Sequence, residues 1–254
     1  MHSRLDIQLP ERLGVAMRIV TLALLSVACP ARPALACDEE SVVDRLQGAE
    51  PTERRDILAE LLSHAMAGPD REVAISLLMQ AIERTTGDCC ADVARHVGTL
   101  ARHHPGLVAN SLPTLESILD KQHGKPLCEV ISVIGNLGPL AKSTIPRLER
   151  LLNQEGQFAL FYNVHAAGAI LRIDPTNSSA VLTLQRLLSS SDRLERWLAA
   201  SAIAYARPSE KWVLDPLRSL LNDNDVTVRA YAAGALWRSA GDVKESLPVL
   251  LSLT

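Results

Sequence analysis

The most concentrated group of potentially reactive side chains lies in the segment Cys89-Cys90-Ala91-Asp92-Val93-Ala94-Arg95-His96. In a helix, Asp92 and His96 would lie one turn apart, and a cysteine thiolate could join them as a third metal ligand. Tetrahedral zinc needs a fourth group, which Cys37 or Cys128 could supply. The alternative is a helix N-terminus with a surface histidine and with buried or oxidised cysteines. We favour this second interpretation, without a metal or other cofactor, and keep a metal- or ligand-binding, enzyme-like protein as the alternative.

The rest of the sequence shows no motif for catalysis or for a nucleotide cofactor. It has no Gly-x-Ser-x-Gly nucleophile elbow, no glycine-rich phosphate loop and no recognisable pair of carboxylates. Ser189-Ser190-Ser191 precedes Asp192 and is interpreted as a turn before a helix. Arg102-His103-His104 is interpreted as the cationic end of a helix. We therefore expect a protein that is not an enzyme.

The elements that carry these residues are predicted to be helices throughout. Apolar residues recur at three- and four-residue spacing, and turn residues such as Gly68-Pro69-Asp70 separate the blocks. No stretch alternates with the two-residue period of a strand, so the sequence predicts an all-α fold. The predicted helices span residues 39–48, 52–67, 70–84, 89–103, 107–121, 126–137, 143–153, 158–172, 177–190, 192–206, 209–221, 224–239 and 243–253.

The second half of the chain repeats itself. The windows 164–170, 197–203 and 230–236 align without a gap at intervals of 33 residues, with two consecutive alanines in the same place each time. A period of this length is typical of stacked helix pairs. Small residues in the first helix of each pair would let neighbouring helices approach closely. The sequence predicts an α-solenoid of about five to six units.

The segment from Asp225 to Leu236 resembles the HEAT-repeat consensus, in particular the HEAT-like class first described in phycobilin lyases. Asp192 and Arg196 match Asp225 and Arg229 one period earlier. In that family such residues form a ladder between successive units. The resemblance is strong over 143–254, weaker over 89–142 and faint before that. The ladder is interrupted one unit earlier, where Ala159 and Asn163 stand at the positions that correspond to Asp192 and Arg196.

The resemblance implies a binding surface more than a reaction. Deoxyhypusine hydroxylases, which share the repeat, bind iron through His-Glu pairs, and no histidine here is followed by glutamate. Related DNA glycosylases need a basic, aromatic-lined cleft, whereas this chain is acidic and has two phenylalanines. Phycobilin lyases act on cytosolic antenna proteins. We therefore expect a scaffold that binds a protein or peptide of unknown identity.

Residues 1–36 are typical of a secretory signal peptide. The apolar run Ile19–Ala28 follows Met17-Arg18 and leads to Ala34-Leu35-Ala36, a small-x-small exit. The run is too short to span a bilayer, which needs about 20 residues. We expect cleavage after Ala36, a mature solenoid domain at 37–254 and a periplasmic or extracellular location.

Three alternatives at the N-terminus remain open. Leu13–Leu25 could form the first solenoid helix instead of a signal. Because Asp6 and Glu11 suit a signal poorly, translation could start at Met17. Cys37 could be lipid-anchored, although Ala34 replaces the leucine that the lipidation motif prefers.

Charge and cysteine content narrow the partners further. The chain has 26 basic and 29 acidic residues; losing 1–36 removes four basic and two acidic ones and leaves a formal charge of −5. Nucleic acid is therefore not an expected partner.

Export would permit disulfides, and we expect one from Cys128 to Cys89 or Cys90, preferably Cys90. The alternative is that Cys128 is a small buried hydrophobe.

The expected partner surface is a concave face lined by the second helices. Its polar candidates are Arg147, Arg150, Gln185, Arg186 and Arg218. Their register would place them in neighbouring rows; the alternative is an ordinary solvated face. The C-terminal segment Leu247–Leu253 lacks the polar cap that terminal repeats need, which favours self-association through the last helix.

Overall fold

A computed structural model describes residues 39–208, 211–241 and 243–252. Residues Glu39–Thr254 form one compact unit. The described residues form helices and no strand, which confirms the predicted all-α class. The expected signal peptide at 1–36 and Cys37 lie outside the described residues. Within those residues, no helix combines the length and the apolar character that crossing a bilayer requires.

The helices form a stack of antiparallel pairs. Their bounds agree with the predicted blocks to within a few residues, except that the predicted helix 107–121 is divided in two at residues 110–111. In chain order they are α2 (Glu39–Gly48), α3 (Pro51–Ala67), α4 (Arg71–Arg84), α5 (Gly87–His103), α6 (Pro105–Ala109), α7 (Leu112–Leu119), α8 (Lys125–Asn136), the 3-10 helix η2 (Gly138–Thr144), α9 (Ile145–Leu151), α10 (Ala159–Ile173), α11 (Ser178–Leu188), α12 (Arg193–Ala206), the 3-10 helix η3 (Lys211–Val213), α13 (Leu214–Leu220), α14 (Val226–Ala240) and α15 (Val243–Leu251). The predicted α-solenoid is confirmed.

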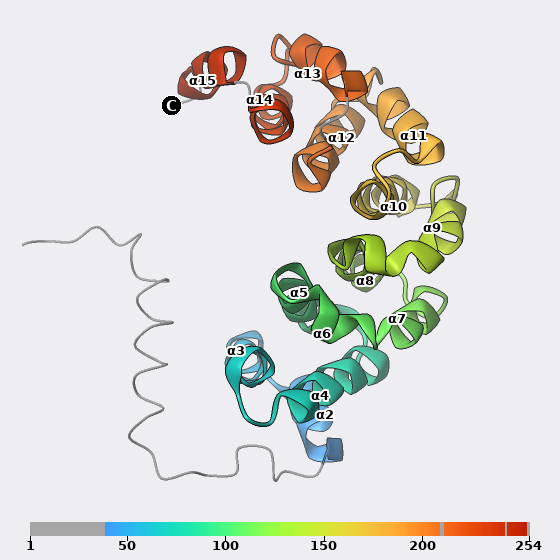
Figure 1. The fold of residues 1–254 in the computed structure, drawn as a ribbon, viewed down its shortest axis with the longest axis vertical. Helices are drawn as coiled ribbons and strands as arrows, with labels where there is room; N and C mark the ends of the chain where they lie inside the picture. The colour runs from blue at the N-terminus through green and yellow to red at the C-terminus, as the bar shows by residue number, and fades with distance from the viewer. Residues whose placement is uncertain (1–38, 209–210, 242, 253–254) are drawn as a thin grey trace, which may run out of the picture. The chain divides into compact units, whose positions relative to one another are not determined.

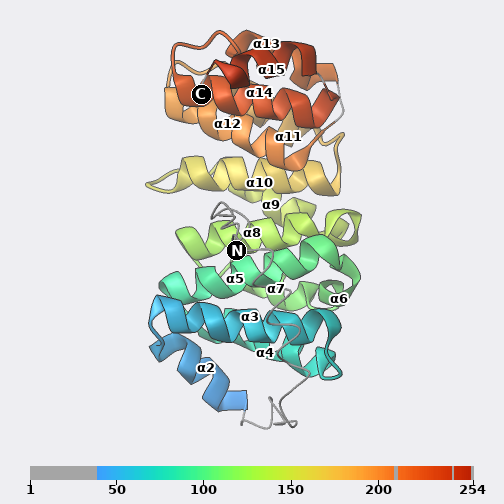
Figure 2. The same ribbon diagram turned by 90° about the vertical axis from the view of Figure 1, so that its left-hand side faces the viewer.

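The stack has an inner and an outer row of helices. Figure 1 shows α3, α5, α8, α10, α12 and α14 along the inside of an arc, with α4, α7, α9, α11 and α13 along the outside. Figure 2 shows the inner helices lying one above another from α3 to α14. The concave side is therefore lined by the first helix of each pair. The expectation that the second helices line it is wrong.

Small residues set the spacing of the inner row. A Cβ added to Gly135 on α8 would lie 2.8 Å from the Cα and Cβ of Ala169 on α10. One added to Gly168 would lie 3.5 Å from the Cβ of Ala202 on α12, an ordinary van der Waals contact. Close approach along the inside of the arc therefore depends most on Gly135.

The core between the rows is built from the residues that repeat in the sequence. The paired alanines of α10, α12 and α14 are fully buried, and so is one leucine from each outer helix of α7, α9, α11 and α13. Burying such a leucine contributes about 1.5–3 kcal/mol. The fully buried leucines are Leu115, Leu148, Leu184 and Leu217. The residues that recur in the sequence are thus the residues that form the core.

Each of three inner helices is tied by one polar side chain to the turn before it. Arg196 Nη1 donates to the carbonyls of Ser190 and Ser191, both at 2.9 Å. Arg229, 33 residues later, bonds the preceding turn in the same way. Asn163 occupies this register one period earlier; with its amide oriented to satisfy both atoms, Nδ2 donates to the carbonyl of Leu151 at 2.7 Å. Asparagine thus replaces the arginine tether.

The expected ladder is present between α12 and the turn before α14, but through a different acid. Arg196 donates two hydrogen bonds, of 2.6 and 3.0 Å, to the carboxylate of Asp223. Arg193 pairs with Asp225 at 3.0 Å. Asp192 and Asp225 also accept backbone N–H bonds at the starts of their helices, so these residues act as N-caps.

Candidate functional site

The thiols of the Cys89–His96 segment point away from a common site. Cys89 Sγ donates to the carbonyl of Leu46 on α2 at 3.3 Å, and Cys90 Sγ to that of Ile82 on α4 at 3.4 Å. Cys128 lies on α8, on the other side of α5 (Figure 1). All three cysteines are buried and free, so the expected disulfide is not formed. Burial raises the pKa of Cys90 to about 11 and that of Cys128 to about 12.

The carboxylate of Asp92 is paired with two arginine side chains. It accepts from Arg54 at 3.0 Å and from Arg95 at 2.9 Å. Burial works against ionisation, yet the two arginines hold the pKa of Asp92 below its usual range. His96 Nδ1 lies 2.8 Å from the carbonyl oxygen of Asp92. No cluster of three or more potential metal ligands occurs in the part of the chain that the structure describes. Arg54, Asp92 and Arg95 therefore form an ion-pair network.

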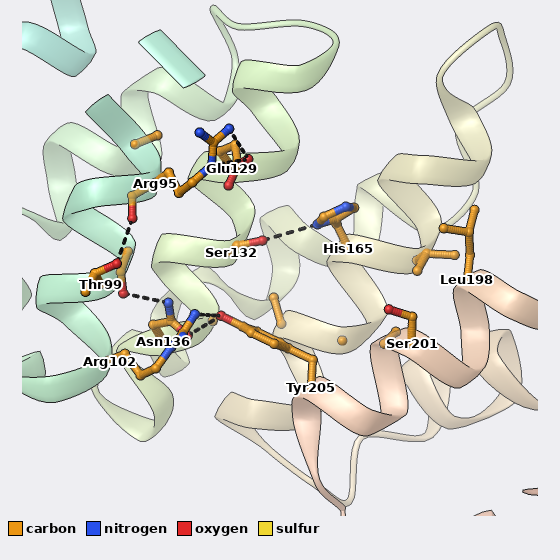
Figure 3. Close-up of a pocket in the computed structure, with 17 residues that line it drawn as sticks. Arg95, Thr99, Arg102, Glu129, Ser132, Asn136, His165, Leu198, Ser201 and Tyr205 are labelled. Atoms are coloured by element: carbon orange, nitrogen blue, oxygen red, sulfur yellow. Dashed lines mark hydrogen bonds and ion pairs between the residues drawn. The ribbon is translucent and has the colours of Figure 1, made fainter. Parts of the chain in front are cut away.

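A hollow of about 450 Å³ lies on the concave face instead. We call it the inner groove; four consecutive inner helices, α5, α8, α10 and α12, contribute its walls (Figure 3). Small residues recur along its middle: Gly98, Gly135, Gly168 and Ser201. Larger polar side chains border this small-residue row, among them Arg95, Arg102, Glu129, Ser132, Asn136, His165 and Tyr205. None of the partner-binding candidates predicted from the sequence lines the groove, whereas Arg95 of the Cys89–His96 segment does.

A serine–histidine pair joins α8 to α10 in the groove. Ser132 Oγ lies 3.2 Å from His165 Nδ1 and donates to the carbonyl of Cys128 at 3.0 Å. With its proton used on that carbonyl, Ser132 accepts from an Nδ1–H of neutral His165. Burial lowers the pKa of His165, and the nearby Glu129 opposes that shift. The side chain of His165 is therefore uncharged near neutral pH.

The helix backbone beside this pair offers no free N–H donor. Ser132 and His165 both lie within helices, where backbone N–H groups already bond to carbonyls one turn back. An oxyanion would therefore find no backbone donor beside Ser132. The pair contributes polar atoms to the lining of the groove.

Tyr205 connects helices that are not neighbours in the stack. Its hydroxyl donates to Asn136 Oδ1 on α8 at 2.7 Å and accepts from Arg102 Nη2 on α5 at 3.0 Å. Asn136 Nδ2 in turn donates to the carbonyl of Gly98 at 2.8 Å. Figure 3 shows Tyr205 reaching from α12 toward these two residues. This chain of hydrogen bonds closes one side of the groove.

The partner-binding candidates from the sequence lie on the outer row. Arg147 and Arg150 on α9 are brought together around a hollow of about 230 Å³. Arg147 pairs with Asp120 at 2.9 Å. Gln185 and Arg186 belong to α11, and Arg218 on α13 pairs with Asp215 and Glu245. At the end of the stack, α15 exposes the apolar residues Val243, Leu247 and Leu251.

No protein-family model and no curated protein matches this sequence. Solved structures of similar fold include the CpcE–CpcF complex of phycocyanin lyase from Nostoc sp. PCC7120, at 16% identity and a TM-score of 0.47 over 89% of this chain and 98% of that chain. An engineered protein aligns at 17% identity and a TM-score of 0.47, over 80% of this chain and 97% of its own. A designed armadillo repeat protein aligns at 16% identity and a TM-score of 0.45, over 80% and 100%.

Proposed function

We propose that this protein is a non-catalytic scaffold that binds an extended segment of a protein or peptide partner in the inner groove. The observation that carries the proposal is that four consecutive inner helices line one hollow of about 450 Å³. Such a volume is within the range of ordinary ligand pockets and would hold a few side chains of a peptide. The proposed binding face is the inner row of helices, whereas the candidates from the sequence lie on the outer row.

The lining of the groove fits a peptide chemically. The small-residue row leaves room for an apolar side chain against α8, α10 and α12. Neutral His165 can exchange hydrogen bonds with peptide groups, and Arg102 has N–H donors beyond the one that it gives to Tyr205. Mixed apolar and polar lining of this kind supports recognition of one segment in one direction.

A groove-filling variant tests the proposal. Ser201→Phe would place a large side chain in the groove from a half-buried position on α12. We expect it to keep the helical circular dichroism of the wild type and to lose capture of the partner from an envelope fraction. Capture at the wild-type level by a folded S201F protein would show that the groove is not the binding face.

The outer row provides the comparison. Arg150 and Arg186 are exposed there, and reversing both charges with Arg150→Glu and Arg186→Glu leaves the groove untouched. We expect this variant to capture the partner normally. If the charge reversal abolishes capture and S201F does not, the partner binds the outer row.

Export is the second part of the proposal, and it rests on the signal-like sequence of residues 1–36. The expected mature protein begins at Cys37 and is periplasmic or extracellular. Intact mass of the protein isolated from its native host decides the matter. A retained 1–36 segment refutes export, and added acyl mass shows a lipid-anchored Cys37.

A further inference from the structure

Beside the inner groove, four arginine side chains line a second hollow of about 570 Å³. They are Arg102 on α5, Arg172 on α10, Arg207 directly after α12 and Arg238 on α14. We call this hollow the arginine pocket. Among residues 39–208, 211–241 and 243–252, no Asp or Glu forms an ion pair with any of the four. The pocket is therefore strongly cationic.

Tyr205 organises two of these guanidinium groups. The Cζ atom of Arg172 lies 4.7 Å from the centre of the tyrosine ring, and that of Arg102 lies 5.4 Å from it. Arg172 also donates to the carbonyls of Gly135 and Tyr205, both at 3.1 Å. These contacts fix the guanidinium of Arg172 before any ligand arrives, which lowers the entropy that binding would lose.

The arginines repel one another in the absence of a bound anion. Burial lowers the pKa of Arg172; Tyr205 opposes this shift, while the positive charges of Arg102 and Arg207 add to it. An anion bound between these groups would relieve the repulsion. Side chains of Arg207 and Arg238 donate no hydrogen bond to the rest of the described chain, so their N–H groups are available to it.

The helix dipole explains only part of this arrangement. Cations are favoured in the last turn of a helix, as Arg102, Arg172 and Arg238 are. Arg207, however, has φ 53° and ψ 48°, the left-handed conformation, and no other non-glycine residue in the described ranges has positive φ. Helix α14 ends with Gly241 in the same conformation, as helices commonly do. Among the described residues, Arg207 is thus the one non-glycine residue in a conformation that favours glycine.

We propose that the arginine pocket binds an oxyanion of the phosphate or sulfate type. Guanidinium groups donate paired N–H bonds that match the oxygens of such anions, and several of them together supply the two charges that a dianion needs. The carboxyl ends of the surrounding helices repel anions, so the arginines must provide the attraction. This inference goes beyond the proposed scaffold function and holds whether or not a peptide binds the groove.

Calorimetric titration of the full chain with inorganic phosphate tests the site. We expect saturable binding of one phosphate, comparable binding of sulfate, and much weaker binding of acetate at equal ionic strength. Arg207→Gly and Arg238→Gln should each weaken phosphate binding by about tenfold, the worth of one charged hydrogen bond. Because glycine is favoured at φ 53°, R207G should melt no lower than the wild type, which separates a lost ligand contact from a lost fold.

Arg84→Gln is the matched control. Arg84 is exposed on α4 and its loss changes the net charge equally, so R84Q should bind phosphate like the wild type. Absence of saturable phosphate binding by the wild type overturns the proposal. So does equal binding of acetate, which would mark a diffuse positive surface, or equal affinities of R207G, R238Q and R84Q.

Discussion

The hydroxyl of Tyr205 lies 2.7 Å from Oδ1 of Asn136, although 69 residues separate the two in the sequence. Their helices, α12 and α8, have α10 between them (Figure 1). In stacked-repeat proteins each unit normally contacts only the next one. This hydrogen bond therefore fastens the arc across a unit instead of within one.

Replacing Tyr205 with phenylalanine should weaken this fastening. The change leaves the buried Oδ1 of Asn136 without its donor, and we expect a loss of about 1–2 kcal/mol in the free energy of unfolding. Urea titration measures that loss, and small-angle scattering should show a more open arc. Tyr231→Phe, on the next inner helix, α14, is the control, because its hydroxyl makes no hydrogen bond among the residues that the structure describes. Equal effects of the two variants would contradict this prediction.

Gly135→Ala should destabilise the stack. Its Cβ would meet Ala169 at 2.8 Å, and since the contact includes the Cα of α10, the helices themselves must shift. Overpacking of this kind lowers the free energy of unfolding by about 1–3 kcal/mol. Gly234→Ala should instead stabilise by about 0.5–1 kcal/mol, because nothing lies within 4 Å of its added Cβ. Thermal melting that ranks G135A at or above G234A would refute the close-approach argument.

The stability of the protein should fall as the pH is lowered through the range in which His165 titrates. Burial lowers the pKa of His165 in the folded state, so the unfolded chain takes up the proton first. The stabilisation is complete above about pH 6.5 and is lost as the pH falls from there toward the folded pKa. His165→Gln should remove this slope even if it lowers stability at every pH. An NMR titration that places the pKa of His165 at or above 6.5 would show that His165 does not cause this pH dependence.

The thiols of Cys89, Cys90 and Cys128 should be unreactive in the native protein. All three are buried, and desolvation raises the pKa of each. Reactivity depends on the thiolate, so alkylation should require denaturant. Peptide mapping after alkylation, with and without denaturant, checks each position separately. A disulfide-linked peptide containing Cys128 would revive the bond expected from the sequence.

The sequence predicted the class of fold because the buried residues repeat. The alanine pairs and the outer-row leucines fill the core, and core positions set the hydrophobic period. The direction of curvature was missed because periodicity shows which residues are buried but not which row is shorter. A physical signal was available: a residue as small as Gly135 brings the first helices closer together, so the stack bends toward them.

The groove was less visible in the sequence than the fold. Its small-residue row was interpreted only as packing, and its polar members differ from unit to unit. Ser132, His165 and Leu198 share one register at intervals of 33 residues, yet they have three different chemistries. The disulfide failed for a related reason, because helical register placed Cys90 and Cys128 on successive helices without giving the direction of either sulfur.

The position of the groove across four inner helices has a mechanical consequence. Straightening the arc would pull α5 and α12 apart, and anything that holds both would be stretched. An occupant of the groove would therefore stiffen the stack against bending. Coupling of this kind is reciprocal, so tension applied to the two ends would loosen the occupant in the same measure. The affinity for the occupant would then depend on the tension in the stack, and binding of the occupant would change the force needed to straighten it.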